Sequence, residues 1–109
     1  MELFRTAVEA LANQDVDGFM GHFDAAIPGR ETLRGNIATM LAMEGATSTI
    51  DYVDDMGDDV KRRVRIDWLL RVGFAAPKRG IVTITVEKRR RSWKITALEP
   101  LDFFKAPSP

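Results

Sequence analysis

Residues 48–72 read STIDYVDDMGDDVKRRVRIDWLLRV, and this stretch carries the strongest structural signal in the chain. Apolar and polar residues alternate on both sides of a centre that contains glycine and aspartate, which is typical of two antiparallel strands joined by a tight turn. We place a three-residue turn at Gly57-Asp58-Asp59. In that register the largely apolar face pairs Tyr52 with Val64, Ile50 with Ile66, and Ser48 with Trp68.

The same register also places opposite charges next to each other. A shift of one residue would set the apolar side chains of the first strand against arginines, so burial and charge both favour this pairing. The expected charge pairs are Asp55 with Lys61 and Asp51 with Arg65 on the polar face, and Asp54 with Arg62 on the apolar side near the tip. We therefore predict a long hairpin with one apolar face and one charged face.

Three helices are expected before this hairpin, because apolar residues recur there at helical spacing. The first stripe is Leu3, Phe4, Ala7, Val8 and Leu11, the second is Val16, Phe19, Met20 and Phe23, and the third is Leu33, Ile37, Met40 and Leu41. The first helix should end near Asn13. Asp15 is the expected N-cap of the second helix, and Gly45 is the expected end of the third.

The segment after the hairpin predicts a second hairpin. Residues 73–79 contain glycine, proline and basic residues and are expected to form an exposed loop. Residues 81–87 and 93–97 then alternate with a period of two on either side of a turn within residues 89–92. A two-residue and a four-residue turn both keep the apolar faces together.

The end of the chain is expected to return to the domain. Pro100 ends the last strand. Leu101, Phe103 and Phe104 are too apolar to remain in water, so we expect them to fold back before residues 106–109 fray.

The composition indicates one soluble globular domain that spans residues 1–109, with 45% apolar and 29% charged residues. No segment has the length and apolar character of a membrane span, and the N-terminus lacks the layout of a signal peptide. We therefore expect a cytoplasmic protein, although a chain from which a leader was removed would look the same. Cysteine is absent and there is one histidine, so we expect no thiol chemistry, no metal and no cofactor.

The charges are segregated although the net charge is zero. Most of the basic residues lie between Val60 and Lys94, where only Asp67 and Glu87 are acidic. A nucleic-acid or membrane surface is one interpretation. Internal ion pairs and protected sheet edges are the interpretation we favour, because no aromatic residue interrupts the arginine run at 89–91. We expect neither nucleic acid nor a membrane as a partner.

Three helices followed by a four-stranded antiparallel meander form an α+β arrangement, with the N-terminal helices packed on one face of a curved sheet. Three segments resemble the nuclear transport factor 2-like superfamily. Residues 11–19 (LANQDVDGF) are similar to its opening helix pair, residues 29–34 (GRETLR) to the start of its third helix, and residues 92–100 (SWKITALEP), with Asp102-Phe103-Phe104, to its final strand.

The resemblance implies a cone-shaped, cystatin-like fold with a pocket between sheet and helices, and frequently a dimer formed through the outer face of the sheet. The superfamily includes ketosteroid isomerases, SnoaL-like polyketide cyclases, limonene epoxide hydrolases, scytalone dehydratases and many non-enzymatic binding domains, so the fold says little about function. Most members have additional residues between the second and third helices, where this chain has only residues 24–28. We therefore expect a smaller, shallower or closed pocket in this minimal member.

Two pairs of side chains are catalytic candidates. His22 and Asp24 would act as a general base and its orienting carboxylate. Residues two apart on a helix do not share a face, so a surface histidine is the alternative. Tyr52 and Asp54 alternate onto the apolar side of the first hairpin, where a tyrosine donor beside an aspartate is typical of isomerase chemistry. A structural ion pair between Asp54 and Arg62 is the alternative.

Large aromatic side chains are the expected walls of a ligand pocket. They are Phe19, Tyr52, Trp68 and Trp93. Ordinary core packing is the alternative for the two tryptophans.

Two functions remain open at this point. The first is a non-catalytic domain that works as a homodimer and binds a small apolar ligand. The second is an isomerase, dehydratase or cyclase that uses Tyr52 and Asp54 inside the cone. We expect the homodimer because no helix is left to cover the outer face of the sheet, which should carry Val53, Leu69, Ile81, Thr83 and Leu98.

Overall fold

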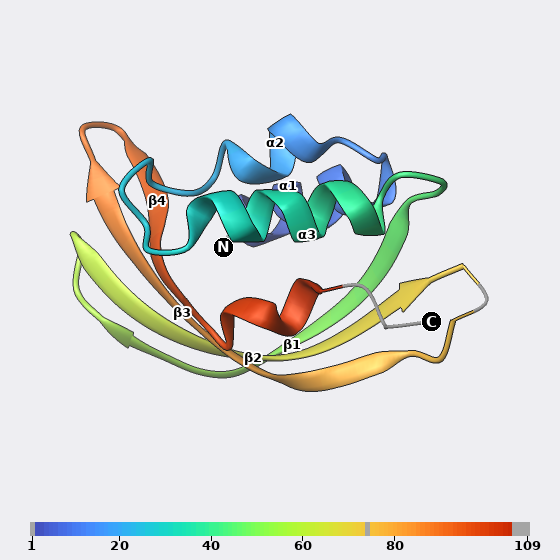
Figure 1. The fold of residues 1–109 in the computed structure, drawn as a ribbon. Coiled ribbons are helices and arrows are strands. Elements are labelled where there is room, and N and C mark those ends of the chain that lie inside the picture. The colour runs from blue at the N-terminus through green and yellow to red at the C-terminus, as the bar shows by residue number, and fades with distance from the viewer. Residues whose placement is uncertain (1, 74, 106–109) are drawn as a thin grey trace.

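The computed structural model describes residues 2–73 and 75–105, which form three helices, four strands and a short 3₁₀-helix. The helices are α1 (Glu2–Ala12), α2 (Val16–Met20) and α3 (Arg30–Met40), the strands are β1 (Ala46–Gly57), β2 (Lys61–Val72), β3 (Lys78–Arg89) and β4 (Ser92–Glu99), and the 3₁₀-helix is η1 (Leu101–Phe104). The strands form one antiparallel sheet in the order β1-β2-β3-β4. This sheet curves like a trough, and the helices lie across its concave side (Figure 1). The predicted α+β fold is therefore confirmed.

Capping explains where α2 begins. The carboxylate of Asp15 accepts a hydrogen bond from the Gly18 amide at 2.8 Å, as predicted for its N-cap. The expected end of α3 at Gly45 is wrong, because the helix already ends at Met40. Gly45 instead lies against the end of α1, where a Cβ atom would clash with the Ala12 carbonyl.

The register of the first hairpin differs from the prediction. Ile50 lies opposite Trp68 and Tyr52 lies opposite Ile66, a displacement of two residues. Side chains alternate with a period of two, so this displacement leaves these residues on their predicted faces.

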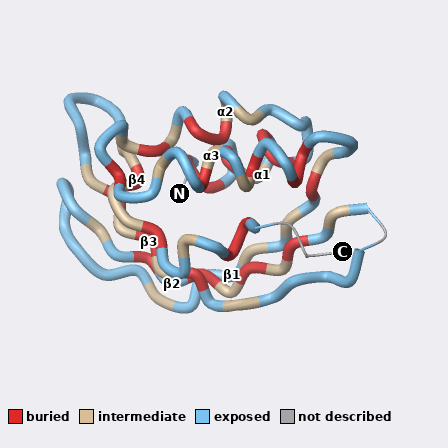
Figure 2. Tube along the Cα trace, in the orientation of Figure 1, coloured by how far each residue is buried: buried red, intermediate tan, exposed pale blue. Residues whose placement is uncertain are grey.

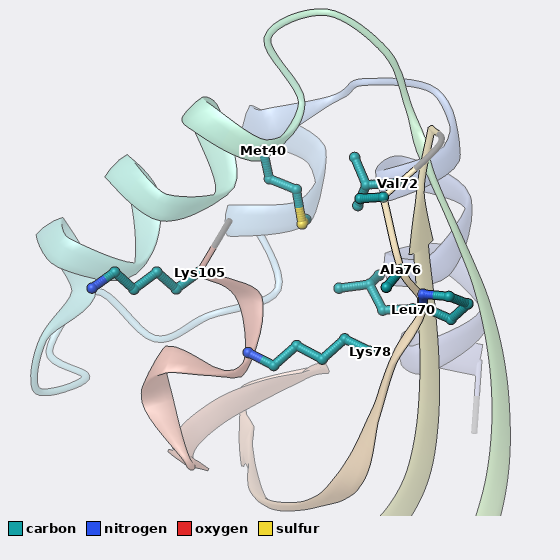
Figure 3. Close-up of a pocket in the computed structure, with 8 residues that line it drawn as sticks. Met40, Leu70, Val72, Ala76, Lys78 and Lys105 are labelled. Atoms are coloured by element: carbon teal, nitrogen blue, oxygen red, sulfur yellow. The ribbon is translucent and has the colours of Figure 1, made fainter. Parts of the chain in front are cut away.

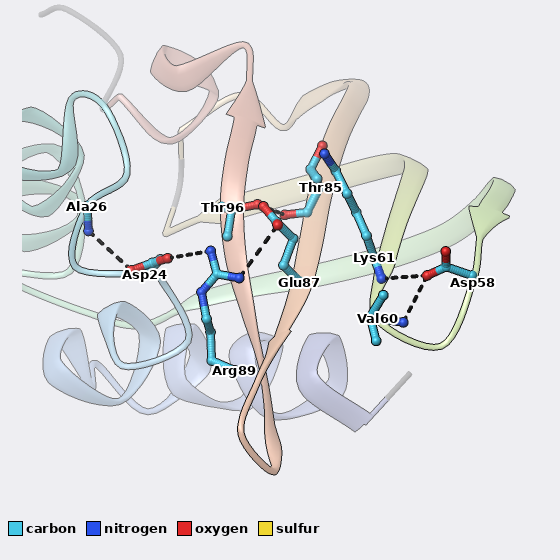
Figure 4. Close-up of polar contacts among 9 residues, drawn as sticks. All are labelled: Asp24, Ala26, Asp58, Val60, Lys61, Thr85, Glu87, Arg89 and Thr96. Carbon is cyan, nitrogen blue, oxygen red and sulfur yellow. Dashed lines mark hydrogen bonds and ion pairs between the residues drawn. The ribbon is translucent and has the colours of Figure 1, made fainter.

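Asp58 stabilises the turn of this hairpin. Its carboxylate accepts hydrogen bonds from the amides of Val60 and Lys61, both at 2.9 Å, and these bonds lower the pKa of Asp58 (Figure 4). The chain therefore reverses over Asp58-Asp59-Val60, one residue later than the expected turn.

A β-bulge in β1 turns Asp54 to the convex face of the sheet. The pairing shifts between Tyr52 and Asp54, so that Asp54 lies opposite Arg65. One extra residue reverses the alternation of the side chains beyond it. The Asp54 carboxylate accepts a hydrogen bond from Arg65 Nε at 2.7 Å on that face, and its predicted place on the apolar side is wrong.

The predicted charge pairs of the hairpin are also wrong, because the register is displaced by two residues before the bulge and by three beyond it. Asp51 lies opposite Asp67 rather than Arg65. The pairs that form are Asp55 with Arg62, Asp54 with Arg65, and Asp67 with Arg79. Acidic and basic side chains therefore do neutralise each other across the sheet, with other partners than those predicted.

A second bulge lies between β3 and β4. The extra residue on β4 is Thr96, and Leu98 beyond it lies opposite Ile84 on the concave face. Leu98 is only 5% exposed, so the prediction that it faces outward is wrong. The turn of this hairpin has two residues, Arg90 and Arg91.

The core lies between the concave face and the helices (Figure 2). Most of the strand residues predicted to share this face are buried: Val64, Ile66, Trp68, Val82, Ile84, Val86 and Ile95. Ile50 and Trp93 are half-buried, and Tyr52 is 49% exposed. No helix within residues 2–73 and 75–105 combines the length and apolar character needed to cross a membrane.

The η1 helix closes the concave side. Phe103 and Phe104 are buried, and the Phe104 ring meets the Trp68 ring edge to face, with the centroids 5.2 Å apart. Gly80 of β3 makes room for this helix, because a Cβ atom there would lie 3.2 Å from the Phe103 ring. The predicted return of residues 101–104 is confirmed, whereas the predicted fraying of residues 106–109 falls outside the described residues.

The two edges of the sheet differ. Residues 22–24 run beside β4, where the Ile95 amide donates to the His22 carbonyl and the Asp24 amide donates to the Ile95 carbonyl, both at 2.8 Å. β1 forms the other edge and pairs with β2 alone.

Trp68→Ala should lower the free energy of unfolding by roughly 3–5 kcal/mol, because it removes a large side chain from a fully packed site. Urea unfolding followed by circular dichroism measures this loss. Trp93→Ala is the matched control, since Trp93 is only half-buried and its removal should cost less. A loss below about 1 kcal/mol for Trp68→Ala would contradict its place in the core.

Candidate functional site

The central part of the space between the concave face and the helices holds almost no cavity. About 10 Å³ remains there, which is at the lower limit for one water molecule. Phe19 and Trp68, two of the predicted pocket walls, are each 1% exposed and belong to the core. Aromatic rings fill most of this space, namely those of Phe4, Phe19, Phe23, Trp68 and Phe104. The aromatic centre of the cone therefore has no room for a ligand.

A larger pocket, of about 300 Å³, lies where β2 passes into β3, and we call it the loop pocket. Its described lining comes from four parts of the fold: Met40 at the end of α3, Leu70 and Val72 of β2, Ala75, Ala76, Pro77 and Lys78 of the loop and β3, and Lys105 after η1. Figure 3 shows Met40 reaching toward the pocket from α3 and Leu70 reaching toward it from β2, with Lys78 along the edge.

The described lining of the loop pocket carries few ionisable groups. Its described lining is chiefly aliphatic and includes no carboxylate, histidine or hydroxyl group. Lys78 Nζ lies 3.4 Å from the Asp102 carbonyl oxygen and 5.2 Å from the centre of the Phe103 ring. Lys78 was expected in the loop but is the first residue of β3.

His22 lies in a separate, open groove of about 580 Å³ between α1, α2 and the start of β4. Trp93, another predicted pocket wall, also lines this groove, as does Lys94. Burial lowers the pKa of His22, and the Lys94 ammonium group lowers it further. The imidazole is therefore uncharged at neutral pH.

Asp24 does not orient His22, because both of its carboxylate oxygens bind elsewhere. One accepts from the Arg89 guanidinium at 3.2 Å and the other from the Ala26 amide at 3.3 Å (Figure 4). Arg89 also lies 3.5 Å from the Glu87 carboxylate. Asp24 thus ties the segment between α2 and α3 to the second hairpin.

Tyr52 and Asp54 do not share an enclosed space. Tyr52 lies on the concave side, with its ring centre 6.2 Å from that of Phe4, and Asp54 lies on the convex side with Arg65. Partial burial raises the pKa of Tyr52, and the nearby Asp55 raises it further. The geometry that the isomerase hypothesis needs is absent from this pair.

No cluster of three or more His, Asp or Glu side chains in residues 2–73 and 75–105 could hold a metal ion. The residues of the loop pocket were not among the predicted site residues. Its walls come from segments far apart in the sequence, and the one local signal was the alternation of β2, which continues through Leu70 and Val72.

His22 should titrate below 6.5, the ordinary pKa of histidine. The unfolded chain then binds more protons than the folded one as the pH falls through 6.5, so the folded state should lose stability on acidification there. His22 is the one histidine of the chain, so its proton NMR titration measures this pKa directly. His22→Gln should remove this part of the pH dependence, and a pKa at or above 6.5 would contradict the assigned burial.

Known proteins resemble this chain in their fold alone. No protein-family model matches the sequence, and no curated protein matches it. Solved structures do match. Bd1075 of Bdellovibrio bacteriovorus is similar with a TM-score of 0.78 and 15% identity over 90% of this chain, which spans 38% of that protein.

Two further structures match over most of their own length. An NTF2-like protein of unknown function from Shewanella oneidensis has a TM-score of 0.74 and 17% identity, with 89% of this chain and 91% of the other covered. A protein of unknown function with a cystatin-like fold from Nostoc punctiforme has a TM-score of 0.71 and 17% identity, with 90% and 84% covered. At such identities the shared property is the fold. The chain therefore has the nuclear transport factor 2-like, cystatin-like fold that its sequence predicted.

Proposed function

We propose that this protein is a non-catalytic binding domain that takes one small apolar molecule into the loop pocket and works as a homodimer. The observation that carries the binding role is the loop pocket itself, with a volume of about 300 Å³ and a chiefly aliphatic lining. Ligand sites in proteins begin at about this volume and are mostly apolar.

The closed cone supports this assignment of the site. Phe104 and Trp68 occupy the place where a ligand would lie between sheet and helices. The loop pocket is bounded on one side by residues 75–77, which belong to no helix or strand. A loop wall adjusts to a ligand at lower free-energy cost than a strand does, because fewer packed contacts have to change.

Ala76→Trp should abolish binding of a neutral apolar dye, because the indole would fill the loop pocket. N-phenylnaphthylamine is a suitable probe, since its fluorescence rises when it leaves water. Ala25→Trp is the matched control, because Ala25 is also exposed in a loop and does not line this pocket. Equal dye binding by the wild type and Ala76→Trp would contradict the loop pocket as the site.

The homodimer would form through the convex face of the sheet, which none of the described helices covers (Figure 1). Apolar side chains on that face are well exposed, with Val53 at 47%, Met56 at 69% and Ile81 at 48%. Leu69 lies among them on β2, and Leu98 takes no part, since it faces the core. A two-fold axis would let this patch bury itself, and the surrounding ion pairs would set the orientation.

Leu69→Arg should convert the dimer to a monomer, because it places a charge within the proposed contact. Sedimentation at low micromolar concentration distinguishes a dimer from a protomer of 12.2 kDa. Met43→Arg is the control, since Met43 is 90% exposed and lies before β1 rather than on the convex face. A monomeric wild-type protein under these conditions would rule out the dimer.

A further inference from the structure

We propose that the ligand of the loop pocket is an apolar monocarboxylate, with its hydrocarbon part against the aliphatic lining and its carboxylate bound by Lys78 and Lys105. This inference rests on the proposed binding function and adds the chemical class of the ligand. Three observations support it: the charged side chains of the lining are both lysines, neither lysine has an ion-pair partner among the described residues, and the C-terminal end of α3 lies beside them.

The charged groups of the described lining have one sign. Lys78 and Lys105 line the pocket, and no acidic side chain does so. Lys78 begins β3 and Lys105 follows η1, so the two belong to different elements. The Lys105 side chain is exposed and extends away from Met40 in Figure 3, so it would turn toward the pocket to reach a bound carboxylate. A cationic ligand would meet repulsion here, and a neutral one would leave both ammonium groups without a partner in the ligand.

Neither lysine has an ion-pair partner in the described part of the chain. Lys78 Nζ contacts the Asp102 carbonyl oxygen at 3.4 Å, which is a long hydrogen bond, and the face of the Phe103 ring. The arginines of the sheet differ in this respect, because Arg62, Arg65, Arg79 and Arg89 each pair with a carboxylate. An ammonium group has three donors, so the donors at the loop pocket remain available for an anion.

The neighbouring helix end disfavours negative charge, and it disfavours a multiply charged anion more than a singly charged one. Met40 is the last residue of α3, so the loop pocket lies beside the C-terminal end of that helix. This end carries the negative part of the helix dipole and opposes a phosphate or other multiply charged anion. The described lining also contains no arginine and no helix N-terminus, the groups that commonly bind phosphate. A carboxylate attached to an aliphatic or aromatic body satisfies both the lysines and the apolar walls.

Competition among three ligands of equal length tests the inference. Octanoate, octanol and octylammonium should each be titrated against protein loaded with N-phenylnaphthylamine at neutral pH. Octanoate should displace the dye at about tenfold lower concentration than octanol, which corresponds to one charge-assisted interaction, and octylammonium should be the weakest. Added salt should narrow the difference between octanoate and octanol, because the lysines are exposed.

Lys78→Gln/Lys105→Gln should remove the advantage of octanoate and leave octanol displacement unchanged. The single variant Lys105→Gln should remove part of that advantage. Lys61→Gln/Lys88→Gln is the matched control, because both lysines are exposed on the sheet and neither lines the pocket. It should keep the wild-type preference.

The outcomes separate the two proposals. Equal displacement by octanoate and octanol, or an unchanged preference in the variant that lacks both pocket lysines, would overturn the carboxylate assignment while the binding function stands. Failure of the wild-type protein to bind the dye and all three ligands would overturn the binding site, and the assigned ligand with it.

Discussion

The packing of Trp68 against Phe104 connects the sheet to the end of the described chain. Trp68 lies in β2, one of the two central strands, and Phe104 belongs to the last described turn of the chain. Their rings meet edge to face at 5.2 Å, and Phe104 also meets Phe19 of α2 at 5.4 Å. Such pairs add roughly 0.5–1.5 kcal/mol each beyond the burial of their surfaces. One connected group of rings therefore holds sheet, tail and helix together, and it also takes up the volume in which a cone of this fold would hold a ligand.

The faces of the sheet were predictable from the sequence, whereas the registers were not. A displacement of two residues moves Ile50 from Ile66 to Trp68 without changing which side chains are apolar and inward. Periodicity alone cannot detect such a displacement, because the pattern repeats every two residues. The bulges near Val53 and Thr96 do change the faces, since each adds one residue and turns the side chains beyond it to the opposite face of the sheet. The misplaced residues, Asp54 and Leu98, lie directly after these bulges.

The site was less predictable than the fold. Phe19 and Trp68 were predictable as residues of the concave side, because both are large aromatic side chains within periodic apolar stripes. Whether these residues line a pocket or a closed core depends on how far η1 enters the trough. That depth is set by side-chain packing and cannot be predicted from periodicity. The loop pocket brings together Met40, Leu70 and Lys105, which are dozens of residues apart and form no motif. Only the three-dimensional arrangement relates them.

The unequal edges of the sheet have a consequence for self-association. Residues 22–24 pair with the amide and carbonyl of Ile95 at the centre of β4, so β1 is the more open edge for a strand from outside. A fibre that grows by edge-to-edge strand pairing requires every molecule to pair at both edges of its sheet. The bridge at Ile95 interrupts the β4 edge, and growth through β1 alone would stop at a pair. The aspartates of β1 would repel each other even within that pair. The topology thus limits edge-to-edge aggregation through an edge strand of 12 residues.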